Sequence, residues 1–354
     1  MTHTPANRRH RVAVLAGDGI GLEVIPAAIE VIDRLCEQGE FAIEWEFYPW
    51  GSEYFKQHGR MMPPDAIQTL AAYDAIFLGA VGDPEIADTE TLWGMLIPIR
   101  REFDQYVNLR PVRTLAGVKH VARTPIDLMI VRENSEGEYS TVGGRFGAGA
   151  DETAVQEAIF THKGISRIVE YAARLAESRR NQITSATKSN GIIHTMPFWD
   201  EVVRETVDKH PGIRLESVLI DALAAKTVLH PDSMDVVVAS NLFGDILSDL
   251  AAAMAGSIGI APSANLNPER LHPSMFEPVH GSAPDIAGQG IANPVGAMWA
   301  GAMMLDHLEE HDAAAQLTAA FERAIADGVS TADLGGTAST SEFTAAVLRN
   351  VDGR

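Results

Sequence analysis

The sequence predicts an α/β fold, and two observations support this prediction. Short apolar segments alternate along the chain with longer segments whose apolar residues recur at helical spacing. This alternation is typical of strands joined by helices around a largely parallel sheet. The 354 residues are also enough for two domains or one large α/β unit, and they contain no internal repeat and no low-complexity linker.

The expected elements follow in chain order. The predicted strands are residues 11–16, 42–47, 75–79, 127–132, 182–187, 214–220 and 234–239. The predicted helices are residues 23–36, 164–177, 198–209, 297–309 and 313–326. Between them, the glycine-rich stretch 143–150 is interpreted as an exposed loop or hairpin arm rather than a boundary between domains.

A glycine cluster follows the first predicted strand. Gly17, Gly19 and Gly21 form the pattern G-x-G-x-G, one residue short of the dinucleotide fingerprint G-x-G-x-x-G. The helix is expected to begin near residues 22–23, with Pro26 in its first turn, where proline is tolerated. The cluster is therefore interpreted as a tight strand–helix turn, with a standard Rossmann site as the alternative.

Composition excludes several functional classes. The chain has 48 acidic and 28 basic residues, a net charge of −20, which disfavours nucleic acids and anionic membranes as partners. Its one cysteine, Cys36, permits no intrachain disulfide and agrees with a cytoplasmic location. No apolar run approaches the ~18 residues of a membrane span. The polar, basic residues 1–11 do not resemble a secretory signal and are expected to be partly disordered.

The most informative stretch is Asn-Leu-Phe-Gly-Asp-Ile-Leu-Ser-Asp at residues 241–249. It follows a predicted strand, so Asp245 and Asp249 fall on one face of a helix. Carboxylate oxygens alone on a short segment suit Mg²⁺ or Mn²⁺. The alternative is a solvated acidic face, but residues 250–255 are uncharged, which indicates that these acids border a buried helix.

Three arginines are candidates for binding an anionic substrate. Arg100 and Arg110 bracket a mixed segment, and Arg132 ends a strongly apolar strand. The guanidinium group binds carboxylates at two points, so three converging arginines imply a dicarboxylate or polycarboxylate. Surface ion pairs are the alternative for Arg100 and Arg110, whereas strand ends such as that of Arg132 are where α/β sheets bind ligands.

Three further residues complete a candidate reaction centre. Asp221 follows a predicted strand, where it acts either as a third metal ligand or simply as an N-cap. Lys188 follows another predicted strand, and near a metal a partly buried lysine loses its proton more readily and can act as a base. Tyr139 is a candidate acid; a surface lysine and a packed tyrosine are the alternatives.

Residues 276–293 contain small residues, prolines, His280 and Asp285. Such a stretch forms a rigid loop whose backbone allows close approach, as a bound nucleotide requires. An unpaired Asp there binds a ribose diol and repels a 2′-phosphate.

With these segments in view, the chain resembles the β-decarboxylating dehydrogenases, which include isocitrate, 3-isopropylmalate and tartrate/D-malate dehydrogenases. The resemblance runs from Arg11 to the C-terminal helices, and its most specific motifs are residues 241–250 and 277–288. It implies two α/β domains with a cleft between them rather than a standard Rossmann fold. The nucleotide-binding domain would comprise residues 1–105 and 256–354, and the central domain, with the dimer interface and an arm, residues 106–255.

The resemblance also implies roles for individual residues. The expected catalytic acid and base are Tyr139 and Lys188; the substrate ligands are Arg100, Arg110, Arg132 and Asp221; the metal ligands are Asp221, Asp245 and Asp249. The expected cofactor-binding residues are Glu277, His280, Gly281, Ser282, Ala283, Asp285 and Asn293. Lys188 and Asp221 would reach the site from the second subunit of a homodimer. NADP-using relatives carry Lys-Tyr where this chain has Asp285-Ile286, so the resemblance favours NAD; it leaves open whether a monovalent cation such as K⁺ assists.

Substrate preference depends on the segment before Arg100. Isopropylmalate enzymes usually have Glu seven residues before this arginine, where the chain has Trp93. Residues 92–108 and 263–268 instead resemble the tartrate and D-malate branch. The expected reaction is metal- and NAD-dependent oxidation and β-decarboxylation of a 2-hydroxy dicarboxylic acid: D-malate to pyruvate and CO₂, or tartrate to oxaloglycolate or glycerate. The alternatives are 3-isopropylmalate dehydrogenase, a non-catalytic regulatory subunit and a plain nucleotide-binding module.

Overall fold

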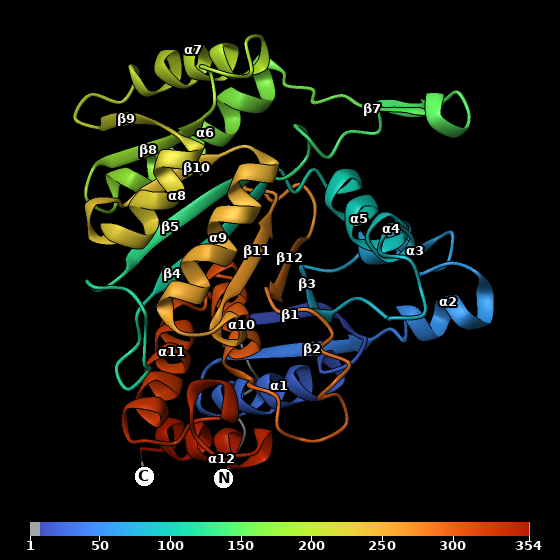
Figure 1. Ribbon diagram of the computed structural model, residues 1–354. Coiled ribbons are helices and arrows are strands. Elements are labelled where there is room, and N and C mark those ends of the chain that lie inside the picture. Colours follow the sequence, from blue (N-terminus) through green and yellow to red (C-terminus); the bar gives the residue numbers. More distant parts are fainter. Residues whose placement is uncertain (1–7, 354) are drawn as a thin grey trace. The chain divides into compact units, whose positions relative to one another are not determined.

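The computed structural model describes residues 8–353, which divide into two compact units (Figure 1). Unit 1 comprises residues 8–105, 114–120 and 255–353, and unit 2 comprises residues 106–113 and 121–254. The units depart from the expected domain ranges at residues 114–120 and 255. Residues 1–7 of the N-terminal segment lie outside the described residues, whereas Arg8–Arg11, expected to belong to a disordered segment, begin the first strand.

Unit 1 contains a sheet with the strand order β2-β1-β3-β12-β11. Its strands are β1 (Arg8–Gly17), β2 (Phe41–Phe47), β3 (Ala75–Ala80), β11 (Pro262–Leu266) and β12 (Ser274–Pro278). Neighbouring strands run parallel except β11 and β12, which pair antiparallel. Residues 12–15 of β1 are fully buried, which shows that both faces of this sheet are covered.

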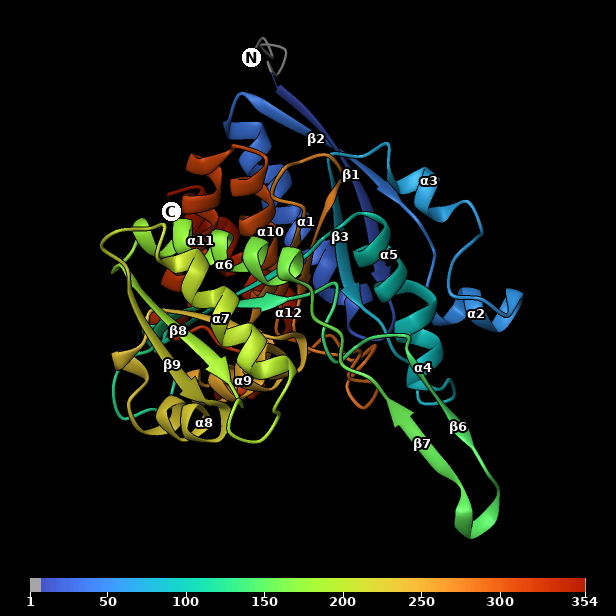
Figure 2. The ribbon, with the colours of Figure 1, turned by 90° about the horizontal axis from the view of Figure 1, so that it is seen from above.

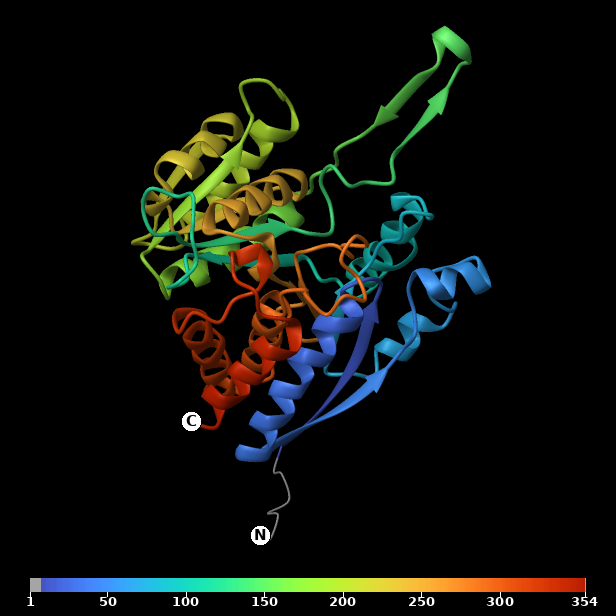
Figure 3. The same ribbon diagram turned by 60° about the horizontal axis from the view of Figure 1, so that its bottom comes forward.

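Two layers of helices cover the unit 1 sheet. One face contacts α1 (Gly21–Gln38) and α10 (Val295–His307), which in turn contact α11 (His311–Ala326) and α12 (Thr340–Val351). The N-terminal helix lies beside the C-terminal helices, so both ends of the described chain build one unit (Figure 3). An apolar cluster on the sheet includes Leu15, Ile76 and Phe103. Residues of α2 (Ser52–His58), α3 (Ala66–Leu70), the π-helix η1 (Leu92–Leu96) and α5 (Ile97–Glu102) contribute to it, and α4 (Asp88–Thr91) directly precedes η1.

The glycine cluster forms the tight turn between β1 and α1. Gly17 and Gly19 have φ values of 71° and 54°, which glycine adopts without strain. A Cβ atom on Gly21 would lie 2.2 Å from the Ala16 carbonyl oxygen, so this turn has no room for a side chain. Pro26 was expected in the first turn of this helix, and this expectation is wrong. Helix α1 begins at Gly21, so Pro26 lies in its second turn.

Unit 2 contains a sheet with the strand order β4-β5-β10-β8-β9. These strands are β4 (Val107–Arg113), β5 (Asp127–Glu133), β8 (Gln182–Thr187), β9 (Arg214–Leu219) and β10 (Val236–Ala239). Only β4 and β5 pair antiparallel among the neighbours here; β5, β10, β8 and β9 run parallel. The helices of unit 2 are α6 (His162–Glu177), α7 (Thr195–Val207), α8 (Ile220–Leu229) and α9 (Asn241–Ala255).

The glycine-rich stretch is a hairpin arm, as predicted. Strands β6 (Gly143–Phe146) and β7 (Thr153–Gln156) pair antiparallel and extend away from the rest of unit 2 (Figure 2). Every residue of both strands is exposed, including Phe146. A two-stranded hairpin is marginally stable by itself in water, so this arm is poorly supported within the single chain.

All predicted strands and helices are present, with ends within a few residues of those expected. The sequence did not reveal β4, β11 and β12. These strands contain proline or small polar residues and lack the long β-branched runs of the parallel strands. Two of their pairings, β4 with β5 and β11 with β12, are antiparallel. Within residues 8–353, no helix has both the length and the apolar character needed to cross a membrane.

Candidate functional site

The carboxyl ends of four parallel strands of unit 2 gather most of the predicted catalytic residues. Arg132 lies near the end of β5, Lys188 follows β8, and Asp221 follows β9. Helix α9, which carries Asp245 and Asp249, starts directly after β10. Because parallel strands end at one edge of a sheet, residues distant in sequence meet there.

Asp245 is the centre of a charged cluster at this edge. Its Oδ1 atom lies 2.6 Å from Arg132 Nη1 and 3.1 Å from Arg110 Nη1. Its Oδ2 atom accepts a hydrogen bond of 3.0 Å from the Tyr139 hydroxyl. The structure thus brings together two of the predicted substrate arginines, the predicted acid and one predicted metal ligand; we call these four residues the Asp245 cluster.

The motif at residues 241–249 explains how α9 comes so close to β5. A Cβ atom on Gly244 would lie 2.6 Å from Arg132 Cβ, so only glycine permits this approach. Asn241 then fixes the guanidinium: its carbonyl oxygen accepts from Arg132 Nε at 2.9 Å, and its Oδ1 accepts from Nη2 at 2.7 Å. Arg132 is only 2% exposed, so it is held in one orientation with its Nη1 edge at Asp245.

Asp249 lies one helical turn after Asp245 and is less strongly held. Arg110 Nη1 lies 3.6 Å from its Oδ1. Partial burial raises the pKa of Asp249, Arg110 opposes that change, and the negative charge of Asp245 adds to it. Of the two carboxylates, Asp249 is therefore the more weakly compensated, and a cation placed beside it would favour its charged form.

Lys188 and Asp221 form a second cluster. Lys188 Nζ lies 2.6 Å from Asp221 Oδ1, and this bond lowers the pKa of the Asp221 carboxyl. The pairing of β8 with β9 places Thr187 opposite Leu219, which brings the two residues together. The N-cap interpretation of Asp221 is wrong, because Leu219 is the N-cap of α8 and Asp221 lies in the first helical turn.

The two clusters of unit 2 do not merge within one chain. Strand β9 lies two positions from β10, a backbone separation of roughly 10 Å. Across the described part of the chain, no three His, Cys, Asp or Glu side chains are grouped so that they could hold a metal ion. The oxygens of Asp245 and Asp249 suit Mg²⁺ or Mn²⁺, but the chain by itself does not add Asp221 to them.

Two supporting residues of unit 2, Glu138 and Glu133, were not predicted from the sequence. Glu138 accepts hydrogen bonds from the Ser240 hydroxyl at 2.7 Å and the Leu242 amide at 3.0 Å, which fixes the start of α9. Glu133 accepts from the Ser135 hydroxyl at 2.7 Å and the Glu136 amide at 2.8 Å, and complete burial raises its pKa to about 7. Their only sequence signal was their position beside Tyr139 and Arg132.

In unit 1, the third predicted arginine is paired with a predicted cofactor residue. Arg100 Nη2 donates to Glu277 Oε1 at 2.9 Å, and Asn265 Nδ2 donates to the same oxygen at 2.7 Å. All three side chains are buried. Arg100 Nε is buried and has no hydrogen-bond partner among the described residues, so this guanidinium has a donor to spare.

The remaining predicted cofactor residues lie between β12 and α10. His280 Nδ1 lies 3.1 Å from the Gly281 carbonyl oxygen, and burial lowers the pKa of the ring, which is therefore neutral near pH 7. His280 Nε2 is buried and unpartnered within the described chain. Ser282 contacts the glycine turn, Asp285 is exposed in a turn beside Ala283, and Asn293 Nδ2 donates to Asp333 Oδ2 at 2.9 Å.

Trp93 lies in the π-helix η1, an element that often occurs at functional sites. The Arg101 guanidinium lies 5.1 Å from the centre of its ring, a cation–π contact that orients the indole. A Cβ atom on Gly94 would lie 2.8 Å from Met61 Cγ, so the backbone beside Trp93 is tightly packed. Seven residues before Arg100 the chain therefore has an indole in contact with Arg101 rather than a carboxylate.

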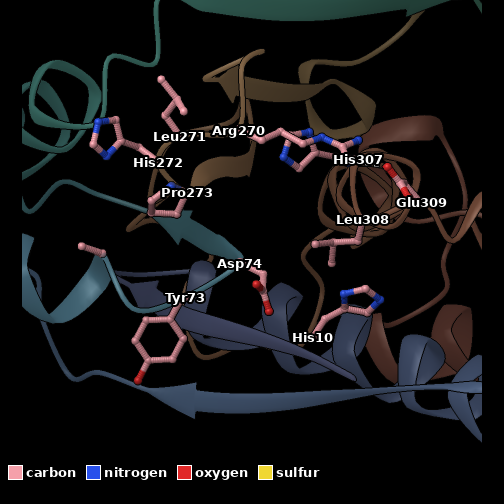
Figure 4. Close-up of a pocket in the computed structure, with 11 residues that line it drawn as sticks. His10, Tyr73, Asp74, Arg270, Leu271, His272, Pro273, His307, Leu308 and Glu309 are labelled. Carbon is pink, nitrogen blue, oxygen red and sulfur yellow. Dashed lines mark hydrogen bonds and ion pairs between the residues drawn. The ribbon is translucent and has the colours of Figure 1, made fainter. Parts of the chain in front are cut away.

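A separate pocket of about 330 Å³ lies at the amino ends of β1, β3 and β12 (Figure 4). His10, Asp74, Arg270, His272 and His307 are among the side chains that line it. Three of its charged or polar groups already have partners: Arg270 pairs with Glu309, His10 with Glu310, and Asp74 accepts from the Arg11 amide. This pocket shares no residue with the predicted sites.

Comparison with known proteins gives a consistent result at the level of family. The family model of isocitrate/isopropylmalate dehydrogenases matches residues 11–347. A solved isocitrate dehydrogenase from Methylococcus capsulatus has a TM-score of 0.89 and 33% identity, with 97% of this chain and 99% of that chain covered.

Curated relatives have a higher sequence identity to this chain than the solved structure does. A D-malate dehydrogenase (decarboxylating) of Escherichia coli is 52% identical over 352 residues, which cover 96% of this chain and 98% of the relative. A tartrate dehydrogenase/decarboxylase of Pseudomonas putida is 51% identical over 351 residues, 95% of this chain and 96% of the relative. A probable tartrate dehydrogenase/decarboxylase of Bacillus subtilis is 50% identical over 341 residues, with 95% and 96% covered.

Proposed function

The chain belongs to the isocitrate/isopropylmalate dehydrogenase family, and on this premise we propose that it oxidises and decarboxylates D-malate or a tartrate isomer with NAD and a divalent metal ion. The names of relatives with about half of their residues identical support this substrate class. The observation that carries the proposal is the Asp245 cluster, in which two buried arginines and a phenol surround a carboxylate.

Arginines recognise the substrate in this proposal. Arg110 and Arg132 are 7% and 2% exposed, and their guanidinium groups are held by Asn108, Ser248 and Asn241. Because these bonds fix the direction of the remaining donors, a carboxylate binds with little loss of side-chain freedom. Arg100, whose Nε atom has no partner in the described chain, is the proposed third contact.

Asp245 and Asp249, joined by Asp221 of a second copy, are the residues proposed to hold Mg²⁺ or Mn²⁺. A bound divalent ion would polarise the C2 oxygen of the substrate, which favours loss of the hydroxyl proton and later stabilises negative charge there. Arg110 and Arg132 pair with Asp245, so this carboxylate lies in a positive environment.

Two side chains are proposed to move protons. Lys188 Nζ takes the C2 hydroxyl proton, directly or through water, while the C2 hydride passes to the nicotinamide of NAD. The bond from C3 to its carboxylate then breaks, CO₂ leaves, and the electron pair forms an enolate. The Tyr139 hydroxyl gives its proton to C3, which yields pyruvate from D-malate. Tartrate gives oxaloglycolate by oxidation alone. After decarboxylation it gives hydroxypyruvate, which becomes glycerate when the NADH formed in the first step returns its hydride and a proton is added.

A homodimer completes this site in our proposal. Helix α8 is rich in apolar residues, but only Leu223 and Thr227 of the helix are buried, and Val228 and Leu229 are exposed. Ile246 of α9 and Phe146 of the hairpin arm are exposed as well. A second copy of the chain would cover these surfaces and bring its own Lys188 and Asp221 to the Asp245 cluster.

The decisive test is a comparison of initial rates with D-malate, the tartrate isomers, 3-isopropylmalate and isocitrate, each with NAD or NADP and with Mg²⁺ or Mn²⁺. We expect the highest kcat/KM with NAD and either D-malate or one tartrate isomer. A highest value with isopropylmalate would instead support the leucine-pathway alternative. No turnover with any substrate, in protein that still binds NAD, would support the regulatory-subunit alternative.

A further inference from the structure

The loop that carries Asp285 is fastened to the first turn of α1, and the fastening depends on one side chain. We propose that Glu23 is a positioning residue for this loop and thereby sets the affinity for NAD. The inference rests on the proposed function, because it takes the loop as the adenosine-binding segment. All of the contacts that support it lie within unit 1.

The near side of the loop is attached to the glycine turn. The Ile20 amide donates to the Ser282 carbonyl oxygen at 2.9 Å. A Cβ atom on Gly19 would lie 2.0 Å from the same oxygen, so Gly19 is required for this approach. The G-x-G-x-G cluster therefore receives the loop of its own chain, which accounts for its departure from the dinucleotide fingerprint.

The far side of the loop is attached to Glu23. Its Oε1 accepts from the Gly288 amide at 2.5 Å, and its Oε2 accepts from the Gly290 amide at 2.9 Å. Both glycines have positive φ, 77° and 66°, and a Cβ atom on either would meet nothing within 4 Å. They are needed to turn two N–H groups toward one carboxylate, an arrangement in which backbone amides bind anions.

Asp285 lies between these two attachments. The amides of Ile286 and Ala287 both donate to the Ala283 carbonyl oxygen at 3.1 Å, which makes residues 283–287 a local turn. Beyond Gly290 the chain is held by α12, where Thr340 donates to the carbonyl oxygens of Gly290 and Ala292. Loss of the Glu23 bonds would free the far side of the Asp285 turn without disturbing the α12 contacts.

The experiment compares Glu23→Gln with the wild-type enzyme. Glutamine keeps the shape of the side chain but presents an amide donor to one of the two N–H groups. In the nucleotide-free protein, we expect the amides of residues 288–290 to exchange hydrogen about 10-fold faster, because a charge-assisted pair of bonds is lost. We expect NAD to bind about 5- to 10-fold more weakly by calorimetry, with kcat at saturating NAD and the KM for the hydroxy acid within about twofold of wild type.

Two further variants distinguish a positioning role of Glu23 from a general loss of structure. Glu30→Gln, an exposed change on the same helix, should alter neither exchange nor NAD affinity. Glu23→Asp keeps the carboxylate and should retain part of the protection from hydrogen exchange and part of the NAD affinity. It replaces Glu23→Gln if that variant does not fold. Unchanged exchange, or faster exchange with unchanged NAD affinity, would overturn the inference. Hydrogen exchange and NAD binding are measured without turnover. Both results can therefore be interpreted even if the proposed substrate is wrong.

Discussion

The two predicted sites differ in how completely one chain builds them. In unit 1, the loop of residues 280–293 is held by the glycine turn, by Glu23 and by α12, and Glu277 is held by Arg100 and Asn265. In unit 2, Asp245 and Asp221 belong to separate clusters, each closed by its own ion pairs. The difference indicates that one chain builds the proposed nucleotide site, whereas the proposed metal site needs Asp221 from a second copy.

The ion pairs of unit 2 have a common physical origin. Asp245 is neutralised by two arginines and Asp221 by Lys188. Uncompensated charges at a sheet edge would cost stability, so each cluster is satisfied until a ligand or a second copy changes its partners. The following predictions test this contrast, from the largest expected effect to the smallest.

Asp245→Asn should produce the largest loss. The neutral side chain removes a proposed metal ligand and the partner of Arg132, Arg110 and Tyr139. We expect kcat/KM to fall by about 10³-fold or more, with NAD affinity unchanged, since NAD is proposed to bind unit 1. Metal titration of activity is the measurement, and Asp208→Asn, an exposed change in unit 2, is the control. An unaltered metal requirement would remove Asp245 from the ligand set.

Lys188→Ala should lower kcat by about 10²- to 10³-fold, the range typical of a lost general base, with little change in KM. The sharper result comes from mixing it with Asp245→Asn. If Lys188 and Asp245 of one site come from different chains, each mixed dimer has one site with both changes and one intact site. Activity should then reappear after subunit exchange. If mixtures that are shown to contain mixed dimers stay inactive, Lys188 and Asp245 of one site belong to the same chain.

The double change Asp285→Lys with Ile286→Tyr should erode the preference for NAD over NADP by about 10-fold or more, because a 2′-phosphate gains a cation and loses a repelling carboxylate. Metal dependence should stay as in the wild type if the two sites are built independently. The ratio of kcat/KM values for the two nucleotides is the measurement. A variant with full NAD preference would locate the ribose contact outside this turn.

His307→Gln should have the smallest effect, confined to unit 1 and to acidic pH. Burial lowers the pKa of His307 to about 4, below its ordinary value of 6.5, with a contribution from Arg270. The unfolded chain therefore binds the proton first, and the stability gained from the neutral ring falls as pH drops from 6.5 toward 4. Between pH 6.5 and pH 4, the free energy of unfolding of the variant should fall by about 1–3 kcal/mol less than that of the wild type, as measured by denaturant unfolding. His230→Gln, exposed in unit 2, should behave as wild type.

Local patterns predicted much of this structure. Strands β3 and β10 were predictable because they are apolar and buried on both faces, and the spacing of Asp245 and Asp249 indicated one face of a helix, which is α9. The sequence could not show that Asn241 orients Arg132 or that Glu138 fixes the start of α9, because these contacts join residues about a hundred positions apart. It also could not show that Glu23 holds a loop 265 residues away.

The route of the chain through unit 1 has a consequence for how the protein forms during synthesis. One neighbour of β3 in the sheet is β12, which is synthesised about 200 residues later. Helix α1 packs against α10 and α12, which are synthesised more than 250 residues later. Most of unit 2 is continuous in sequence and can complete its sheet first. The early strands β1, β2 and β3 must therefore wait with apolar faces uncovered, which makes the first hundred residues the part of the nascent chain most in need of a chaperone.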